Sequence, residues 1–213
     1  MQVQRVNYQK QLEQYIAGMH ARQALALHSC CAPCSSAVLE YLTQYFDVTL
    51  FYYNPNIFPR QEYEKRLREQ LALCERLYVP AVACDYEPQD FFDTVRGQEN
   101  EPEGGARCTR CFALRLSYTA GCAARQGIGL LTTTLTVSPH KDAQRINQIG
   151  MQAAQAHGIQ WLCSDFKKNN GYARSIVLSK EYGLYRQDYC GCIFSARERE
   201  KIRSKKQKES EVE

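Results

Sequence analysis

The sequence has none of the long apolar runs that mark secreted or membrane-spanning proteins. Residues 1–20 contain no apolar stretch followed by a small-residue cleavage site. No run elsewhere approaches the roughly 20 apolar residues that a membrane-spanning helix needs. We therefore expect a soluble, cytoplasmic protein that does not contact a membrane.

Internal repeats and linker-like segments are also absent, so nothing in the sequence divides the chain. Its 213 residues suit a single domain, and a hydrophobic content of 44% can supply a sizeable core. We expect residues 1–195 to form one α/β domain. Residues 196–213 then form a charged C-terminal tail.

No strong excess of charge of one sign is present, since the net charge is only +4. Lys167, Lys168 and Arg174 nevertheless lie close together in the sequence, and the tail from Arg197 to Lys208 is rich in lysine and arginine. Such patches can bind phosphates. Acidic residues are interleaved in the tail, which favours a solvated, frayed terminus there. The patch near Lys167 is therefore the better candidate for binding an anion.

Cysteine, in contrast, is abundant, with eleven in the chain. Seven of them fall into three groups, Cys30-Cys31-x-x-Cys34, Cys108-x-x-Cys111 and Cys190-Gly191-Cys192. Thiolates bind zinc and iron-sulfur clusters and also act as nucleophiles in disulfide exchange. In a reducing cytosol such grouping favours a metal or redox site over a structural disulfide framework. The other four are expected to be small buried side chains, Cys74, Cys84, Cys122 and Cys163.

Short apolar strands alternate with helical patterns along the chain. The predicted strands are 24–28, 48–53, 79–84, 129–134 and 160–162. The predicted helices are 6–19, 35–45, 59–78, 90–95, 110–125 and 141–157. This order indicates an α/β fold with a Rossmann-like parallel sheet flanked by helices, of the HUP or PP-loop kind.

Ligands of such sheets bind outside the carboxyl ends of the strands, where Cys30, Cys31 and the segment 132–138 are expected to lie. The cysteine groups can therefore converge on one crevice. An ATP-dependent enzyme on this fold needs a phosphate loop after the first strand. That place holds His28-Ser29-Cys30-Cys31 and no SGGxDS-like loop, which argues against the use of ATP.

The first two cysteine groups together provide enough sulfur for a four-thiolate centre, which zinc or a four-iron four-sulfur cluster could occupy equally well. A helix beginning near Cys34 would favour thiolate there. Cys190 and Cys192 flank a glycine, which fits either a strained, easily reduced disulfide or a further pair of ligands. Asp165 is a candidate ligand to a second metal, although a cap or surface salt bridge is the commoner role. His28 and His140 are equally ambiguous.

Five segments closely resemble the epoxyqueuosine reductase QueH family over nearly the whole of residues 24–195. They are HSCCAPCS (28–35), RCTRCFALRL (107–116), TTTLTVSPHKD (132–142), SDFKK (164–168) and LSKEYGLYRQDYCGCIFS (178–195). The resemblance implies a reductase that converts epoxyqueuosine to queuosine in the anticodon loop of tRNA, the last step in making this base. Its partners would be that tRNA and an electron donor.

The same resemblance implies roles for individual residues. Cys30, Cys31, Cys108 and Cys111 would hold a four-iron four-sulfur cluster, and Cys190 with Cys192 would form a catalytic, redox-active disulfide. An additional mononuclear iron is associated with the family, for which Cys34 and Asp165 are the candidate ligands. Iron with an open position could act as a Lewis acid on the epoxide oxygen.

Two other functions compete with this one. A zinc-stabilised RNA-binding protein without catalysis would use the same four thiolates structurally. A disulfide oxidoreductase acting on proteins would use the last cysteine pair and would leave the first two groups unexplained. Iron, sulfide and visible absorbance in the purified protein would favour the reductase.

Overall fold

The computed structural model describes residues 6–210, with side chains described over residues 6–204. Five parallel strands form one sheet in the order β3-β2-β1-β4-β5. Their bounds are β1 (Gln23–His28), β2 (Phe46–Tyr52), β3 (Ala81–Ala83), β4 (Leu130–Thr133) and β5 (Gln160–Trp161). The strand order reverses between β1 and β4, as in doubly wound α/β folds. The predicted Rossmann-like parallel sheet is therefore confirmed.

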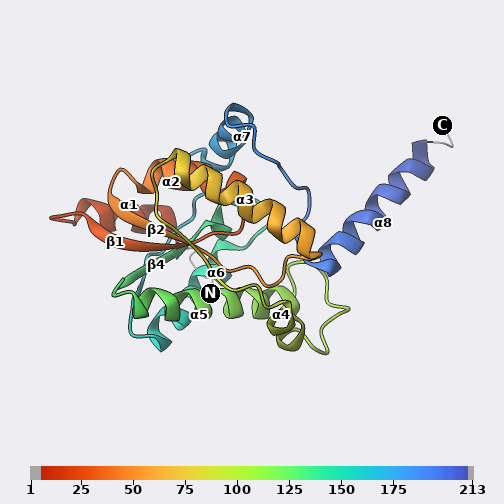
Figure 1. Ribbon diagram of the computed structural model, residues 1–213, viewed down its shortest axis with the longest axis horizontal. Coiled ribbons are helices and arrows are strands. Elements are labelled where there is room, and N and C mark those ends of the chain that lie inside the picture. Colours follow the sequence, from red (N-terminus) through yellow and green to blue (C-terminus); the bar gives the residue numbers. More distant parts are fainter. Residues whose placement is uncertain (1–5, 211–213) are drawn as a thin grey trace.

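Helices cover both faces of the sheet (Figure 1). One face carries α1 (Tyr8–Ala17), α2 (Ala32–Leu42), α3 (Arg60–Arg76) and α7 (Gly171–Glu181). The other face carries α4 (Pro88–Thr94), α5 (Ala106–Arg125) and α6 (Ala143–Ala156). A short 3-10 helix, η1 (Thr134–Val137), follows β4. The long helix α8 (Ile193–Ser210) projects away from the body.

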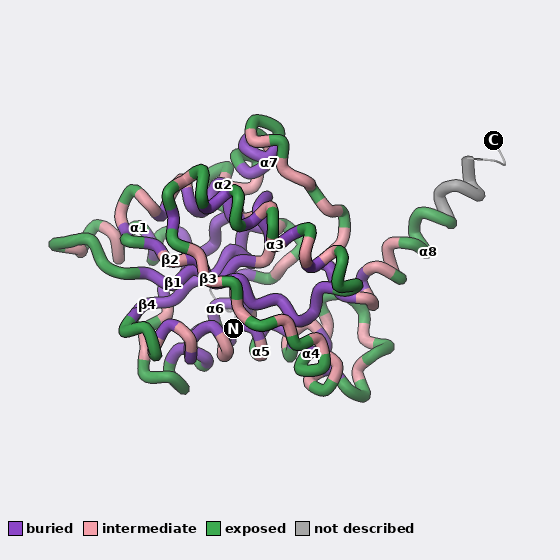
Figure 2. The backbone as a smooth tube through the Cα atoms, viewed as in Figure 1, coloured by how far each residue is buried: buried purple, intermediate pink, exposed green. Residues whose placement is uncertain are grey.

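The apolar segment of β1 is buried on both faces, which explains its unbroken hydrophobic sequence. Leu25 and Leu27 point into the core under α1, α2 and α3, whereas Ala26 packs with residues of α5. Alternate side chains of a strand point to opposite faces, so a central parallel strand needs apolar residues at every position. Figure 2 shows this centre as buried and the described part of α8 as a mixture of intermediate and exposed residues.

The sequence located all five strands and the first six helices, with shifts at their ends. The helix predicted to begin at residue 35 begins at Ala32, because Pro33 fits the first turn of a helix, where no backbone donor is needed. Cys34 therefore lies inside the first turn of α2. The remaining helices, α7 and α8, were not predicted.

The tail differs from the frayed terminus expected for it. Residues 193–210 are helical, and Glu198 binds Arg107 at 3.1 Å. Asp188 binds Arg199 at 2.9 Å and also pairs with Arg203. Residues 211–213 lie outside the described residues. Over residues 6–210, no helix combines the length and the apolar character needed to cross a membrane.

Candidate metal and thiol site

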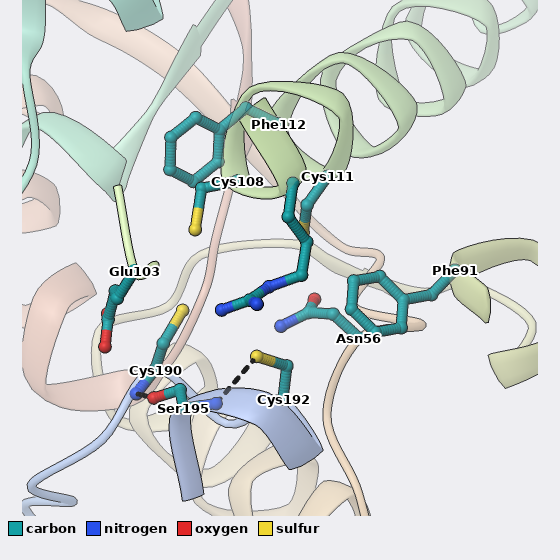
Figure 3. Close-up of a pocket in the computed structure, with 10 residues that line it drawn as sticks. Asn56, Phe91, Glu103, Cys108, Cys111, Phe112, Cys190, Cys192 and Ser195 are labelled. Carbon is teal, nitrogen blue, oxygen red and sulfur yellow. Dashed lines mark hydrogen bonds between the residues drawn. The ribbon is translucent and has the colours of Figure 1, made fainter. Parts of the chain in front are cut away.

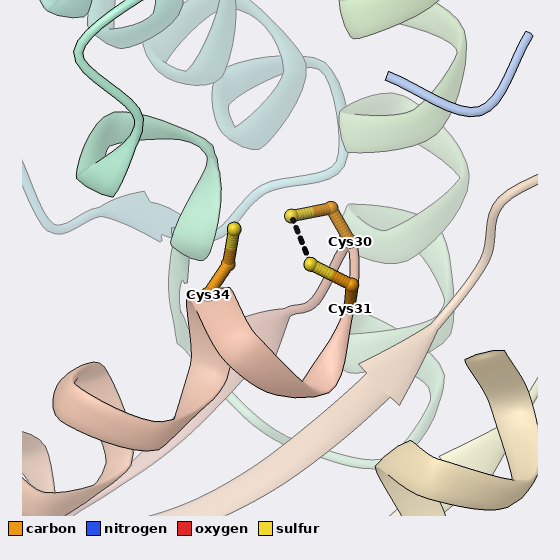
Figure 4. Close-up of side chains that lie close together, drawn as sticks. All are labelled: Cys30, Cys31 and Cys34. Carbon is orange, nitrogen blue, oxygen red and sulfur yellow. Dashed lines mark hydrogen bonds between the residues drawn. The ribbon is translucent and has the colours of Figure 1, made fainter. Parts of the chain in front are cut away.

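Three sulfur atoms meet where β1 passes into α2, at the reversal of strand order. The Sγ atoms of Cys30, Cys31 and Cys34 all lie within 4.8 Å of one another, and Cys30 and Cys31 are 3.8 Å apart (Figure 4). Cys31 is the N-cap of α2 with extended backbone, and Cys34 follows one helical turn later. The change from strand to helix therefore aims both neighbouring cysteines at one centre, as predicted for this turn.

The surroundings of this group, the Cys30 triad, favour a negative charge. Hydrogen bonds from the thiols of Cys31 and Cys34 hold the pKa of Cys30 well below its usual range, and Lys141 and Arg115 lower it further. The thiol of Cys30 in turn raises the pKa of Cys31 to about 12 and that of Cys34 well above its usual value. The Cys30 thiolate is therefore stabilised by the protein itself, whereas Cys31 and Cys34 lose their protons only when a metal cation binds.

A second group of sulfur atoms lines a pocket between α5 and the start of α8. Its walls include Cys108, Cys111, Cys190 and Cys192, which we call the pocket cysteines, together with Phe91, Phe112 and Asn56. The sulfurs of Cys108, Cys190 and Cys192 point into a common space (Figure 3). The CxxC spacing places Cys108 and Cys111 on one side of the first turn of α5. All four carry free thiols.

The pocket cysteines are electrostatically unlike the Cys30 triad. Burial raises the pKa of Cys111 to about 12, although Arg115 opposes the shift. Burial and the neighbouring Cys190 raise the pKa of Cys192 to about 12 as well. Burial also raises the pKa of Cys108. The thiols of Cys108, Cys111 and Cys192 are therefore neutral at physiological pH when no metal is bound.

A buried arginine lies near both sulfur groups. Arg115 is 1% exposed, donates a hydrogen bond to Asn54 Oδ1, and has a buried Nε without a partner among the described residues. Burial opposes its charge, but the thiols of Cys111, Cys30 and Cys190 outweigh burial and raise the pKa of Arg115. Cys30 and Cys108 also pack against one apolar cluster that contains Phe112. The two sulfur groups are therefore neighbours.

Lys141 is a second cation near both groups. Burial lowers its pKa, but the thiols of Cys190, Cys30 and Cys34 outweigh burial and raise it. Sequence reasoning missed both cations as site residues. A usable signal was available for Arg115, because a position four residues after Cys111 lies on the same face of a helix as that cysteine.

The other predicted site residues lie around this centre. Asp165 is 9% exposed and binds the ammonium of Lys167 at 2.7 Å. It is not among the potential ligands of the Cys30 triad, which is the one compact group of three or more found within residues 6–204. His28 is fully buried and binds Thr133 at 2.8 Å, and burial followed by Arg115 lowers its pKa to about 3. His140 is exposed.

The predicted anion patch is largely neutralised by acidic partners. Lys167 pairs with Asp165, and Arg174 binds Glu40 through two hydrogen bonds of 2.8 and 2.6 Å. Lys168 is exposed. Of the isolated cysteines, Cys74 is buried in the main core, while Cys84 and Cys122 pack at the edge of the core beneath α5. Cys163 is half-buried.

Comparison with known proteins identifies the family. A sequence model of the family "Epoxyqueuosine reductase QueH" matches residues 25–198. The chain belongs to this family. A relative with that name from Staphylococcus epidermidis is 41% identical over 207 residues, covering 92% of this chain and 87% of the relative. One from Streptococcus pyogenes serotype M1 is 40% identical over 203 residues, covering 91% and 80%. Another, from Thermotoga maritima, is 35% identical over 179 residues, covering 81% and 90%.

A solved structure has a similar fold. It is the U34-tRNA thiolase NcsA from Methanococcus maripaludis with its 4Fe-4S cluster, and it superposes with a TM-score of 0.53 at 9% sequence identity. The match covers 85% of this chain and 64% of that chain. At this identity the likeness concerns the fold alone, and it agrees with the predicted Rossmann-like class. Membership of the QueH family rests on the sequence matches and confirms the resemblance found in the five segments.

Proposed function

We propose that this chain is an epoxyqueuosine reductase that removes the epoxide oxygen of epoxyqueuosine in the anticodon loop of tRNA and so produces queuosine. The observation that carries the proposal is a family match over residues 25–198 that includes all seven grouped cysteines. The position of the Cys30 triad at the reversal of strand order, where ligands of this fold bind, supports it.

The donor set of the site fits an iron-sulfur cluster. We propose Cys30, Cys31, Cys108 and Cys111 as its ligands, and Cys34 with Asp165 as ligands of an additional iron. Four thiolates around a cluster leave a net negative charge, which the buried Arg115 and the nearby Lys141 are placed to balance. When bound, the cluster supplies electrons one at a time, and iron with an open position polarises an epoxide oxygen.

The Cys190 and Cys192 thiols are proposed as the source of an electron pair. Their oxidation to a disulfide forms one S–S bond and releases two electrons and two protons. Conversion of an epoxide to an alkene and water consumes the same number of each. An external dithiol or another electron donor must then reduce the disulfide again before the next turnover.

The pocket has features suited to a polar substrate. Oδ1 of Asn56, which lines the pocket, is buried without a hydrogen-bond partner among the described residues. A buried acceptor of this kind favours a ligand that supplies a donor, such as a substrate hydroxyl. Phe91 and Phe112 exclude water from the same space.

For the tRNA, helix α8 is the best placed basic element because it begins immediately after Cys192. Its Arg197 and Lys201 are exposed, and neither has an ion-pair partner among the described residues. Lys168 is a further candidate on the body. Phosphate contacts of this kind position an RNA without reading its sequence.

The test is an anaerobic assay with tRNA that carries epoxyqueuosine, a chemical reductant and the reconstituted protein, followed by mass analysis of the released nucleosides. The proposal predicts the loss of one oxygen atom from the modified nucleoside. Unchanged epoxyqueuosine, with protein that contains iron and sulfide, would contradict it. Colourless protein that contains zinc would favour the non-catalytic RNA-binding alternative.

A further inference from the structure

The loop that carries Cys190 and Cys192 rests on helix α3, and one buried side chain of this helix contacts the loop directly. Arg66 is 2% exposed and donates from Nη1 to the backbone carbonyl of Cys190 at 3.2 Å. Its guanidinium also lies 5.0 Å from the centre of the Tyr189 ring. The charge is paired within the helix, because Nε donates to Glu62 at 2.7 Å. Arg66 is therefore held by Glu62 of its own helix through Nε and can fix the loop through Nη1.

Gly191 shows how closely the guanidinium approaches the loop. A Cβ at this position would lie 2.8 Å from Arg66 Nη1 and 3.0 Å from a side-chain carbon of Ile57, closer than packed atoms allow. The φ of Gly191 is +116°, a backbone conformation that other residues rarely adopt. Its carbonyl accepts a hydrogen bond from Phe58 N at 2.9 Å. The glycine therefore permits the loop to lie directly against Arg66 while its neighbours Cys190 and Cys192 face the pocket.

The segment before the loop is attached to the same helix. Tyr185 N donates to Glu69 Oε1 at 2.7 Å, and the Lys65 ammonium lies 3.3 Å from the centre of the Tyr185 ring. Glu62, Lys65, Arg66 and Glu69 are spaced so that they lie along one side of α3. This side of α3 forms a platform under residues 185–191.

We propose that Arg66 is a positioning residue that holds the Cys190-Gly191-Cys192 loop so that both thiols face Cys108 and Cys111 across the pocket. The inference rests on the proposed function and extends it, because Arg66, which lies outside the cysteine motifs, sets the geometry of the Cys190 and Cys192 thiols. The role of Arg66 is exerted through the Cys190 carbonyl and the Gly191 backbone. It does not require contact with substrate.

A merely structural role for Arg66 makes a different prediction. A buried ion pair that only stabilises α3 would, when removed, loosen the protein generally, so all half-buried cysteines would become more reactive together. A positioning role confines the change to the loop. Cys122 serves as an internal reference because it is half-buried on α5, away from α3.

The experiment measures alkylation of each cysteine by N-ethylmaleimide, followed by peptide mass mapping, in the full-length protein with reconstituted metal. In Arg66→Met we expect Cys190 and Cys192 to react about 10-fold faster relative to Cys122, because the loop opens more often. Arg66→Lys, which keeps the charge and one donor, should give an intermediate rate. Gly191→Ala should have the same effect as Arg66→Met, and the effects should be non-additive in the double variant because both disturb one contact.

Turnover gives the second readout. We expect kcat of Arg66→Met to fall about 10- to 100-fold with KM within about twofold, since misplacement of a reacting group affects the chemical step. Arg68→Met is the matched control, because Arg68 is exposed on the same helix, and it should leave both readouts unchanged.

Equal acceleration of Cys122 and the loop cysteines would overturn the proposal, as would unchanged alkylation of the loop in a folded Arg66→Met. If that variant does not fold, the same criteria apply to Arg66→Lys and Gly191→Ala. The alkylation readout does not depend on the substrate. A protein that fails to reduce epoxyqueuosine would therefore contradict the proposed function and leave the test of Arg66 intact.

Discussion

The Cys30 triad and the pocket cysteines are two neighbouring thiol groups, and the triad contains a thiol, Cys30, that ionises more readily than an ordinary cysteine. The triad occupies the start of α2, where its sulfurs lie within 4.8 Å of one another and the pKa of Cys30 is held well below its usual range. The pocket cysteines are spread over the start of α5 and a loop, and burial raises the pKa of both Cys111 and Cys192 to about 12. The triad thus contains a thiolate that can bind a cation, whereas the Cys111 and Cys192 thiols stay protonated until a metal or an oxidant removes their protons.

This difference in pKa indicates which thiol binds a metal first and separates metal binding from electron transfer. The stabilised thiolate of Cys30 would be the first ligand for a metal ion at this site. The proposed role of Cys190 and Cys192 is to carry two electrons with two protons. Arg115 lies near both groups, and its pKa responds to cysteines of both. It therefore couples them electrostatically.

The largest expected effect is that of Cys30→Ala, which removes the one stabilised thiolate. We expect loss of bound iron and a fall in reductase activity of about 1,000-fold or more, because the pocket thiols alone cannot begin to bind the metal. Iron analysis and the nucleoside mass assay measure the two effects. Cys122→Ser is the matched control and should retain both. Retention of iron and activity in Cys30→Ala would show that the Cys30 thiolate is not needed for metal binding and that the two groups do not differ in this respect.

The variants Cys190→Ser and Cys192→Ser test whether this pair of pocket cysteines carries electrons or binds the cluster. If these residues carry electrons and do not bind the cluster, each variant should retain iron and visible absorbance. Turnover with a dithiol as reductant should fall about 100-fold, because a single thiol cannot form the intramolecular disulfide. Loss of iron in both variants would mean that they are metal ligands, the alternative reading of this pair.

Arg115→Met tests the coupling between the groups. Removal of the buried guanidinium breaks its hydrogen bond to Asn54 and leaves Lys141 as the cation near the Cys30 thiolate. We expect the free energy of unfolding of the metal-free protein, measured with urea, to fall by about 2–4 kcal/mol. Arg110→Met, at an exposed position of the same helix, should change it by less than about 0.5 kcal/mol. Equal stability of the two variants would show that Arg115 has no special role.

The smallest effect is expected outside the pocket, on α8. The double variant Arg197→Ala/Lys201→Ala should weaken tRNA binding only a few-fold and should reduce the salt dependence of log Kd by about 1–2. Its iron content should equal that of the unsubstituted protein. Filter binding over a salt series measures the slope. An unchanged slope would mean that the tRNA does not contact this part of α8.

The sequence allowed the sheet and the cysteine groups to be predicted because both follow local rules. Unbroken apolar runs such as 24–28 suit a strand buried on both faces, and CxxC spacing places two thiols on one helical turn. Arg115 was missed because an arginine within a helix usually points to solvent, although its position four residues after Cys111 places it on the same helical face as that cysteine. Its burial depends on Asn54 and on thiols from three separate segments. The ordered start of α8 likewise depends on a partner distant in sequence, Arg107, and on Asp188 in the preceding loop.

In the proposed site, thiols from distant segments bind a single iron-sulfur centre, with Cys108 as a ligand and Cys34 outside the cluster. The most direct test is to measure the iron and sulfide content of anaerobically reconstituted protein in Cys108→Ala and Cys34→Ala side by side. We expect Cys108→Ala to lose the cluster and its visible absorbance, whereas Cys34→Ala should retain about four iron and four sulfide per chain. A full cluster in Cys108→Ala, or its loss in Cys34→Ala alone, would contradict it.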